Sequence, residues 1–194
     1  MNKHINAIAT DVFGVSLPAA SVALKEWSTD EAAANDADAI MLSTNGKTSA
    51  QNITEDLNNP PCVRSLTVTA GGTAGDIKAG SVRVYGTNYA DEEIYEDFEF
   101  SADTGATVSG AKAFKTVTKV TIPAQDGTGC TFTVGTGSKL GLPCMFASKP
   151  LFIATLGGSA DAGTLAVDDD ELEKNGYTPN ASLAGTAVKL ALVI

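Results

Sequence analysis

Short segments in which apolar and polar residues alternate dominate the chain from residue 37 to its end. Residues 65–69 and 80–86 each place apolar side chains on one face and mostly polar side chains on the other. A period of two is typical of a half-buried strand. Similar segments follow at intervals of about ten residues, with Gly and Pro between them: 92–100, 114–122, 130–134, 150–156, 163–167 and 186–194. This spacing predicts a mainly β fold, an antiparallel β-sandwich or barrel-like domain over residues 37–194.

Two dipeptides predict tight hairpins between these segments. Asn45-Gly46 separates residues 39–43 from 47–50, and Asp126-Gly127 follows the segment that ends before Pro123. Asn-Gly and Asp-Gly tolerate the positive φ angles of the turns that join neighbouring antiparallel strands.

The apolar faces of the alternating segments predict the core of the β domain. These faces carry the aliphatic and aromatic residues that recur at every second position. The predicted core residues are Leu66, Val68, Val82, Val84, Ile94, Phe98, Phe100, Val120, Ile122, Phe132, Val134, Val188, Leu190 and Leu192.

Residues 1–36 have a different pattern and predict an extended N-terminal arm with a possible short helix. Residues 21–27 could form a short helical turn, and Ser28 is a candidate N-cap before acidic residues and alanines. Apolar residues on a free arm need a partner to cover them, so we expect the arm to anchor the protein on a partner or a neighbouring subunit. In the alternative, it completes the core of its own domain. The predicted contact residues are Ile5, Ile8, Val12, Phe13 and Val15.

Glu96 is the exception on an otherwise apolar strand face. It lies on the same side of the segment 92–100 as Ile94 and Phe98. A carboxylate on a buried face needs hydrogen bonds or a cation. We favour a structural carboxylate held by backbone N–H groups, or by Arg64 or Arg83, over a metal ligand or a catalytic acid.

Composition and charge exclude several classes of protein. Of the 194 residues 43% are hydrophobic and 19% charged, which is typical of a globular chain. No run approaches the roughly 18 apolar residues of a membrane helix, so no membrane partner is expected. The net charge of −10 disfavours contact with nucleic acid, which requires positive charge. The first residues do not form a secretory signal, so we expect the chain to fold in the cytoplasm where it is made.

The chemistry-bearing residues do not form a recognisable site in the sequence. Cys62, Cys130 and Cys144 lack metal-ligand spacing, and His4 is the only histidine. Residues 135–141 lack the Gly-Lys-Ser/Thr order of a phosphate loop and fit a glycine-rich turn better. Residues 168–171 lack the spacing of a calcium loop and fit a solvated acidic loop. We therefore expect no cofactor, no metal and no enzymatic activity.

Five motifs in a fixed order resemble small virion proteins of tailed bacteriophages. The resemblance spans residues 58–143 and has a weaker echo at the C-terminal strand. Tyr95 and the acidic residues 91–93 depart from the usual pattern, and residues 1–57 carry no resemblance. The motifs are Asn-Asn-Pro-Pro-Cys-Val-Arg-Ser-Leu-Thr-Val-Thr at 58–69, Val-Tyr-Gly-Thr-Asn at 84–88, Ile-Tyr-Glu at 94–96, Ala-Phe-Lys-Thr-Val-Thr at 113–118 and Lys-Leu-Gly-Leu-Pro at 139–143.

The resemblance implies a capsid decoration protein that binds and stabilises the outside of the phage head. Its partners would be the major capsid protein and further copies of itself, with a trimer implied by analogy, and its location the capsid surface of the virion. Two alternatives stay open at this point: a tail or neck structural protein, and a carbohydrate-binding module. The second would need exposed aromatic side chains, and only 6% of the residues are aromatic.

Overall fold

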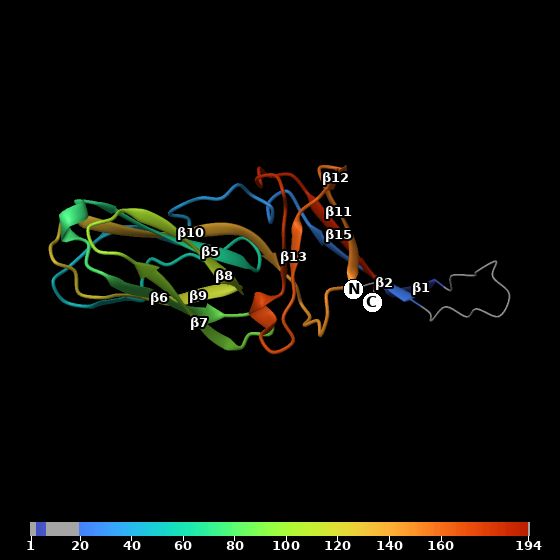
Figure 1. Ribbon diagram of the computed structural model, residues 1–194, viewed down its shortest axis with the longest axis horizontal. Helices are drawn as coiled ribbons and strands as arrows, with labels where there is room; N and C mark the ends of the chain where they lie inside the picture. Colours follow the sequence, from blue (N-terminus) through green and yellow to red (C-terminus); the bar gives the residue numbers. More distant parts are fainter. Residues whose placement is uncertain (1–2, 7–19, 194) are drawn as a thin grey trace.

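A computed structural model describes residues 3–6 and 20–193, and it is built almost entirely of antiparallel strands. Strands make up 51% and helix 3%, which confirms the predicted mainly β class. The molecule is elongated, with a β-sandwich at one end and a smaller sheet at the other (Figure 1).

Two sheets form the sandwich. The first has the order β13-β14-β10-β5-β8, with β3 also paired to β10, and the second has the order β4-β9-β6-β7. We call them sheet B and sheet C. The strands of sheet B are β3 (Met41–Asn45), β5 (Arg64–Gly72), β8 (Ala106–Phe114), β10 (Cys130–Gly141), β13 (Thr164–Ala166) and β14 (Gly176–Thr178). Those of sheet C are β4 (Gln51–Ile53), β6 (Gly80–Thr87), β7 (Glu93–Phe100) and β9 (Thr116–Ile122).

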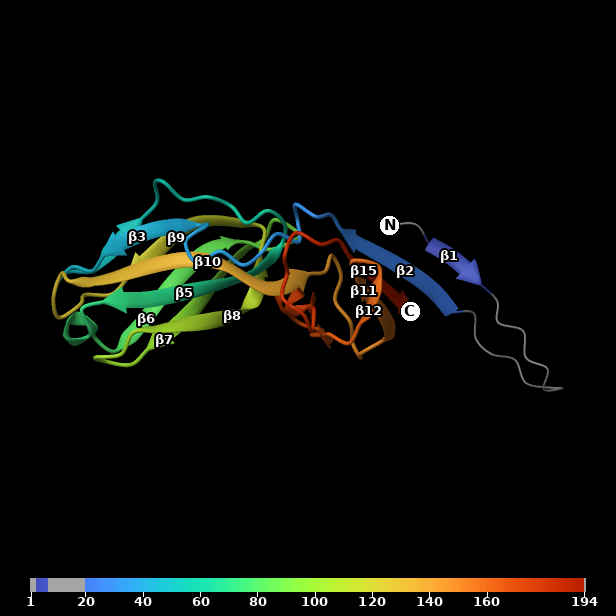
Figure 2. The same cartoon turned by 90° about the horizontal axis from the view of Figure 1, so that it is seen from above.

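The third sheet, sheet A, combines the two ends of the chain. Its order is β1-β2-β15-β11-β12, and it lies beyond the sandwich in both views (Figure 2). Its strands are β1 (Lys3–Asn6), β2 (Ala20–Trp27), β11 (Leu151–Leu156), β12 (Ser159–Asp161) and β15 (Val188–Val193). Two short 3-10 helices, η1 (Ala74–Asp76) and η2 (Leu172–Lys174), complete the described elements.

All fourteen predicted core residues are buried, but they belong to two separate cores. The first core fills the space between sheets B and C. The second lies between sheet A and the far end of sheet B, and contains Val188, Leu190 and Leu192 with Trp27 and Tyr177. Strand β10 joins the cores, because its first half packs into the sandwich and its last residues into the second core.

The predicted helix at residues 21–27 is wrong, because this segment is strand β2. It pairs along its length with β15, which lies at the other end of the chain. A partner so distant in sequence leaves no local signal, and pairing with it overrides a weak helical pattern. Ser28 and Glu31 exchange side-chain and backbone hydrogen bonds of 2.8 and 3.3 Å, as in a capping box, although Ser28 caps no helix. Only a single turn follows it, and the segment beyond Ser28 does not become a helix.

Both predicted hairpins are also wrong. Strand β3 pairs with β10 and β4 pairs with β9, so Asn45-Gly46 begins a crossing between sheets, and so does Asp126-Gly127 between β9 and β10. Gly46 has no positive φ. It is needed for close packing, since a Cβ there would lie 2.3 Å from the Cys130 sulfur. A two-residue turn with positive φ forms instead at Gly157-Gly158, between β11 and β12.

The predicted boundary at residue 36 does not separate an arm from the β domain. Residues 20–27 are an interior strand of sheet A, between β1 and β15, and Trp27 lies in the second core. The segment predicted as a glycine-rich turn at 135–141 is part of β10, with a register shift between Thr136 and Leu140.

Candidate interaction surface

The outer face of sheet A is built from the residues of three central strands that point away from the second core. Strands β2, β15 and β11 are in register, so their outward side chains form rungs across the sheet. The outer face comprises Val22, Val193 and Leu151 in the first rung, Leu24, Ala191 and Ile153 in the second, and Glu26, Lys189 and Thr155 in the third.

The first two rungs of the outer face are entirely apolar and largely exposed. The exposed fractions are 79% for Leu151, 72% for Ile153, 54% for Leu24 and 39% for Val193. An antiparallel sheet that covers a core on one face normally has polar residues on the other. Sheet A is apolar on both, and contiguous exposed apolar residues mark interaction sites.

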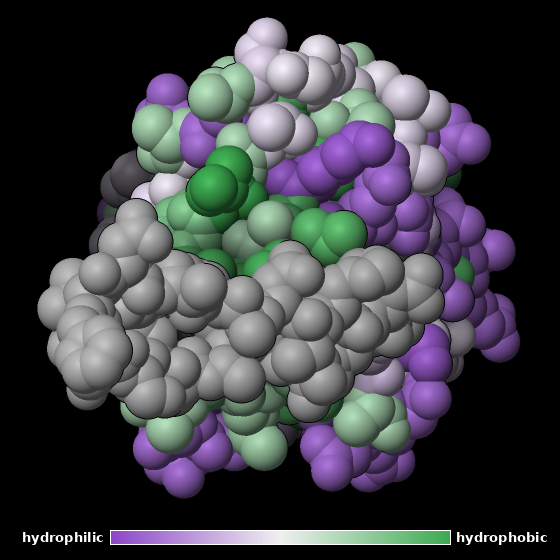
Figure 3. Space-filling model, turned by 90° about the vertical axis from the view of Figure 1, so that its right-hand side faces the viewer, coloured by the Kyte–Doolittle hydropathy of each residue, from purple (hydrophilic) through white to green (hydrophobic). Residues whose placement is uncertain are grey.

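The outer face has a shallow groove along β15. Ala191 lies between the larger side chains of Leu24 and Ile153, and this groove has a volume of about 460 Å³. At one end Lys189 Nζ lies 3.1 Å from Glu26 Oε1. At the end of the molecule formed by sheet A, apolar side chains gather beside hydrophilic ones (Figure 3).

The structure places only the first predicted contact residue of the N-terminal arm. Ile5 belongs to β1, which pairs with β2 at the edge of sheet A opposite Ser21. Ile8, Val12, Phe13 and Val15 lie outside the described residues. The predicted anchor therefore starts from the sheet that carries the apolar outer face.

Glu96 is held by backbone N–H groups, as the favoured interpretation predicts. The amide nitrogens of Ala111 and Lys112 donate to its Oε1 over 2.6 and 3.2 Å. The predicted arginine alternatives are wrong, because Arg83 pairs with Asp97 and Arg64 donates to backbone and side-chain oxygens elsewhere. Burial raises the pKa of Glu96, and the two N–H donors oppose this effect.

A network of ion pairs joins the sandwich to the loop around η2. Lys112 Nζ lies 2.7 Å from Glu171 Oε1 and 3.0 Å from Glu173 Oε1. Lys139 Nζ donates to the carbonyl oxygens of Ala111 and Lys174. Within the 168–171 segment, the Asp168 carboxylate accepts from the backbone N–H groups of Asp170 and Glu171, and Glu171 pairs with Lys112 and Lys174. Among the described residues no group of three or more His, Cys, Asp or Glu could hold a metal ion.

Lys139 gives this network a testable pH dependence. Burial lowers the pKa of Lys139 from 10.5 to about 8, so between pH 8 and about 10 the unfolded chain binds a proton that the folded chain does not. Stability conferred by this residue therefore rises with pH across that window. We expect the melting temperature of the wild type, relative to Lys139→Met, to increase from pH 8 to pH 10. Thiols titrate in the same range, but both proteins contain them, so their effect on the difference in melting temperature cancels. A difference that stays constant from pH 8 to pH 10 would contradict the lowered pKa of Lys139.

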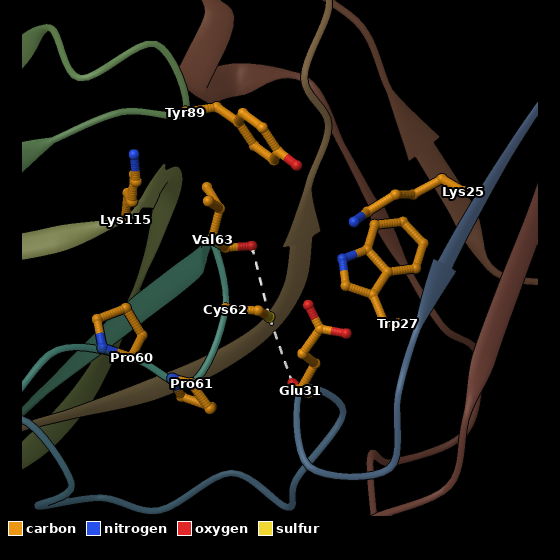
Figure 4. A pocket seen from close by; sticks show the side chains of 9 residues that line it. All are labelled: Lys25, Trp27, Glu31, Pro60, Pro61, Cys62, Val63, Tyr89 and Lys115. Carbon is orange, nitrogen blue, oxygen red and sulfur yellow. Dashed lines mark hydrogen bonds between the residues drawn. The ribbon is translucent and has the colours of Figure 1, made fainter. Parts of the chain in front are cut away.

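A pocket of about 440 Å³ lies where sheet A meets the sandwich. Lys25 and Trp27 line it from β2, Pro60 and Cys62 from the segment before β5, and Tyr89 from the loop after β6 (Figure 4). The Cys62 thiol donates to the carbonyl oxygen of Glu31 over 3.3 Å. Burial raises the pKa of Cys62 to about 11, so at neutral pH it is a protonated hydrogen-bond donor and a poor nucleophile. The pocket borders the second core, to which Trp27 belongs and against which Cys62 packs.

In the described part of the chain, no helix is long and apolar enough to cross a membrane. The chain matches no protein-family model, no curated protein and no solved structure.

Proposed function

We propose that this protein is a non-enzymatic structural component of a tailed-phage virion, which decorates the outside of the head. In this proposal it binds the major capsid protein through the end of the molecule formed by sheet A, and it acts as a homo-oligomer. The observation that carries the proposal is the outer face of sheet A, with two apolar rungs exposed on a molecule that is otherwise rich in acidic residues. Such a face suits a protein that works in an assembly; in this proposal a second copy covers it, and the N-terminal segment at the edge of the same sheet contacts the capsid.

The division of the chain supports this proposal. The segment with the phage-like motifs, residues 58–143, contains strands β5 to β10 of the sandwich. Sheet A contains no residue of that segment. In this proposal the sandwich, which resembles that of other small virion proteins, acts as a scaffold. Sheet A supplies the contact that is specific to this protein.

The thiol chemistry also favours a structural role. Burial raises the pKa values of Cys62, Cys130 and Cys144. The thiolate is the nucleophilic form of cysteine, so all three side chains are poor nucleophiles at neutral pH. In this proposal they fill space in and around the cores.

The N-terminal segment is proposed as the capsid anchor. At about 1.5–3 kcal/mol for each fully buried side chain, burying Ile5, Ile8, Val12, Phe13 and Val15 would contribute on the order of 8–15 kcal/mol. Ordering the backbone opposes this by about 1–2 kcal/mol per residue. One arm would therefore bind weakly, and stable attachment would depend on several copies engaging the shell together.

Deleting residues 1–18 tests the anchor. We expect the deletion variant to lose co-sedimentation with phage heads that lack this protein. Its melting temperature should change little, because the segment adds only the edge strand β1 to the described sheet. Phe13→Asp should also abolish binding, while Thr10→Asp adds the same charge at a polar position and should retain most of it. Full binding by the deletion variant would contradict the anchor, and a large drop in melting temperature would show that the segment completes its own domain.

The exposed aromatic pair of sheet C does not favour the carbohydrate-binding alternative. Tyr85 and Tyr95 lie with ring centroids 6.1 Å apart. The Lys119 ammonium is 3.7 Å from the centroid of the first ring, and the Arg83 guanidinium is 4.4 Å from that of the second. One face of each ring is thus already covered by a cation, which leaves less aromatic surface for stacking on a sugar.

A further inference from the structure

We propose that two copies of this chain associate by packing the outer faces of their A sheets against each other. This dimer would supply the homo-oligomer of the proposed function, and the inference rests on the proposed function only in that the protein associates with itself. It is independent of any capsid, so it can fail or succeed separately.

The shape of the outer face is self-complementary. Ala191 is the one small residue among the three outward residues of β15, and the larger side chains of Leu24 and Ile153 flank it on the neighbouring strands. If two faces meet about a two-fold axis between β11 and β15, Ile153 of each copy lies in the groove above Ala191 of the other. Such reciprocal contacts are typical of two-fold interfaces, where one patch meets itself.

The charge distribution favours the same occupant. Each chain has a net charge of −10, so two copies repel each other over most of their surfaces. On the outer face, the only acidic and basic side chains among the nine residues of the three rungs are Glu26 and Lys189, which pair with each other. This face is therefore neutral and apolar, and it can approach a second acidic copy with little electrostatic cost.

The size of the face suits a reversible association. Strands lie about 4.8 Å apart and rise about 3.3 Å per residue, so a five-stranded sheet whose central strands β11 and β15 have 6 residues each covers roughly 20 by 20 Å. Two such faces cover about 800 Å² in total, which is below the roughly 1,000 Å² at which stable specific interfaces begin and typical of weak association. We therefore expect an equilibrium that depends on protein concentration.

Sedimentation velocity on the free full-length protein, from about 1 to 200 μM, tests the proposal. We expect the mass to rise with concentration toward twice the 19.8 kDa of the chain. Ile153→Glu should remain monomeric across this range. Leu42→Glu is the matched control, because Leu42 is also an apolar strand residue, 67% exposed, and lies on β3 of the sandwich; it should associate like the wild type.

Further variants keep the result interpretable. Leu151→Lys, at a position 79% exposed, should also give a monomer and replaces Ile153→Glu if that variant fails to fold. A monomeric wild type, a dimer retained by both variants, or a trimer would overturn the two-fold packing. A wild-type monomer that dimerises after deletion of residues 1–18 would assign the face to the chain's own N-terminal segment. A monomeric wild type whose Ile153→Glu variant loses head binding would assign it to the capsid, and either outcome overturns the proposal.

Discussion

Replacing Trp27 by alanine is expected to lower the free energy of unfolding by about 3–5 kcal/mol. Trp27 is 1% exposed and lies on the inner face of β2, where it is the largest side chain of the second core. Its removal leaves a cavity between sheet A and the end of sheet B. For a chain of this length, such a loss corresponds to a fall in melting temperature of roughly 6–20 °C.

Differential scanning calorimetry at low protein concentration measures this effect. Leu24→Ala is the matched control, because Leu24 lies on the same strand but points to the exposed outer face. We expect that substitution to change stability by less than about 0.5 kcal/mol. A Trp27→Ala protein as stable as Leu24→Ala would show that the second core does not support the fold.

Replacing Arg64 by methionine is expected to destabilise the protein by about 3 kcal/mol or more. Arg64 is fully buried, and its guanidinium donates to the carbonyl oxygens of Gly137 and Ala33 and to the side-chain oxygen of Asn35. These bonds tie the irregular part of β10 to the segment between sheet A and the sandwich. Methionine keeps the volume but leaves these acceptors without donors, at about 1–3 kcal/mol for each group that water cannot reach.

Trp27 fluorescence reports this second prediction, because Trp27 is the chain's only tryptophan and lies in the second core. We expect the Arg64→Met midpoint in urea to fall both by fluorescence and by circular dichroism. Arg64→Lys retains a donor but not the planar fork, and should lie between the wild type and methionine. An unchanged midpoint for Arg64→Met would contradict the role assigned to these hydrogen bonds.

The periodicity of the sequence predicts the core residues better than it predicts how their strands pair. A period of two identifies the inward side chains of each strand, and Val68, Phe98 and Leu190 are buried as expected. It contains no information on which sheet a strand joins. Asn45-Gly46 and Asp126-Gly127 therefore predict hairpins, whereas the strands on either side of each belong to different sheets.

The candidate surface could be predicted only in part. The segment at 150–156 is apolar at successive positions, which is consistent with a strand that is apolar on both faces. The exposed rung that contains Ile153, however, also contains Leu24 from β2 and Ala191 from β15. Because these residues come from distant parts of the chain, the outer face exists only once three strands pair in register.

Arg64 illustrates why a buried polar group is difficult to predict from sequence. The sequence offers the Arg64 guanidinium only as one alternative partner for Glu96. In the structure its acceptors are the backbone carbonyl oxygens of Gly137, in the irregular part of β10, and of Ala33, together with Asn35 Oδ1. Acceptors of this kind have no signature in residue type.

Imaging the source phage particle at a resolution sufficient to trace this chain tests the central claim most directly. The proposal predicts density for the protein on the outside of the head, with the end formed by sheet A toward the shell and the sandwich pointing outward. Density for this chain in the tail or the neck, or a head-bound molecule that meets the shell with the far end of its sandwich, would contradict it.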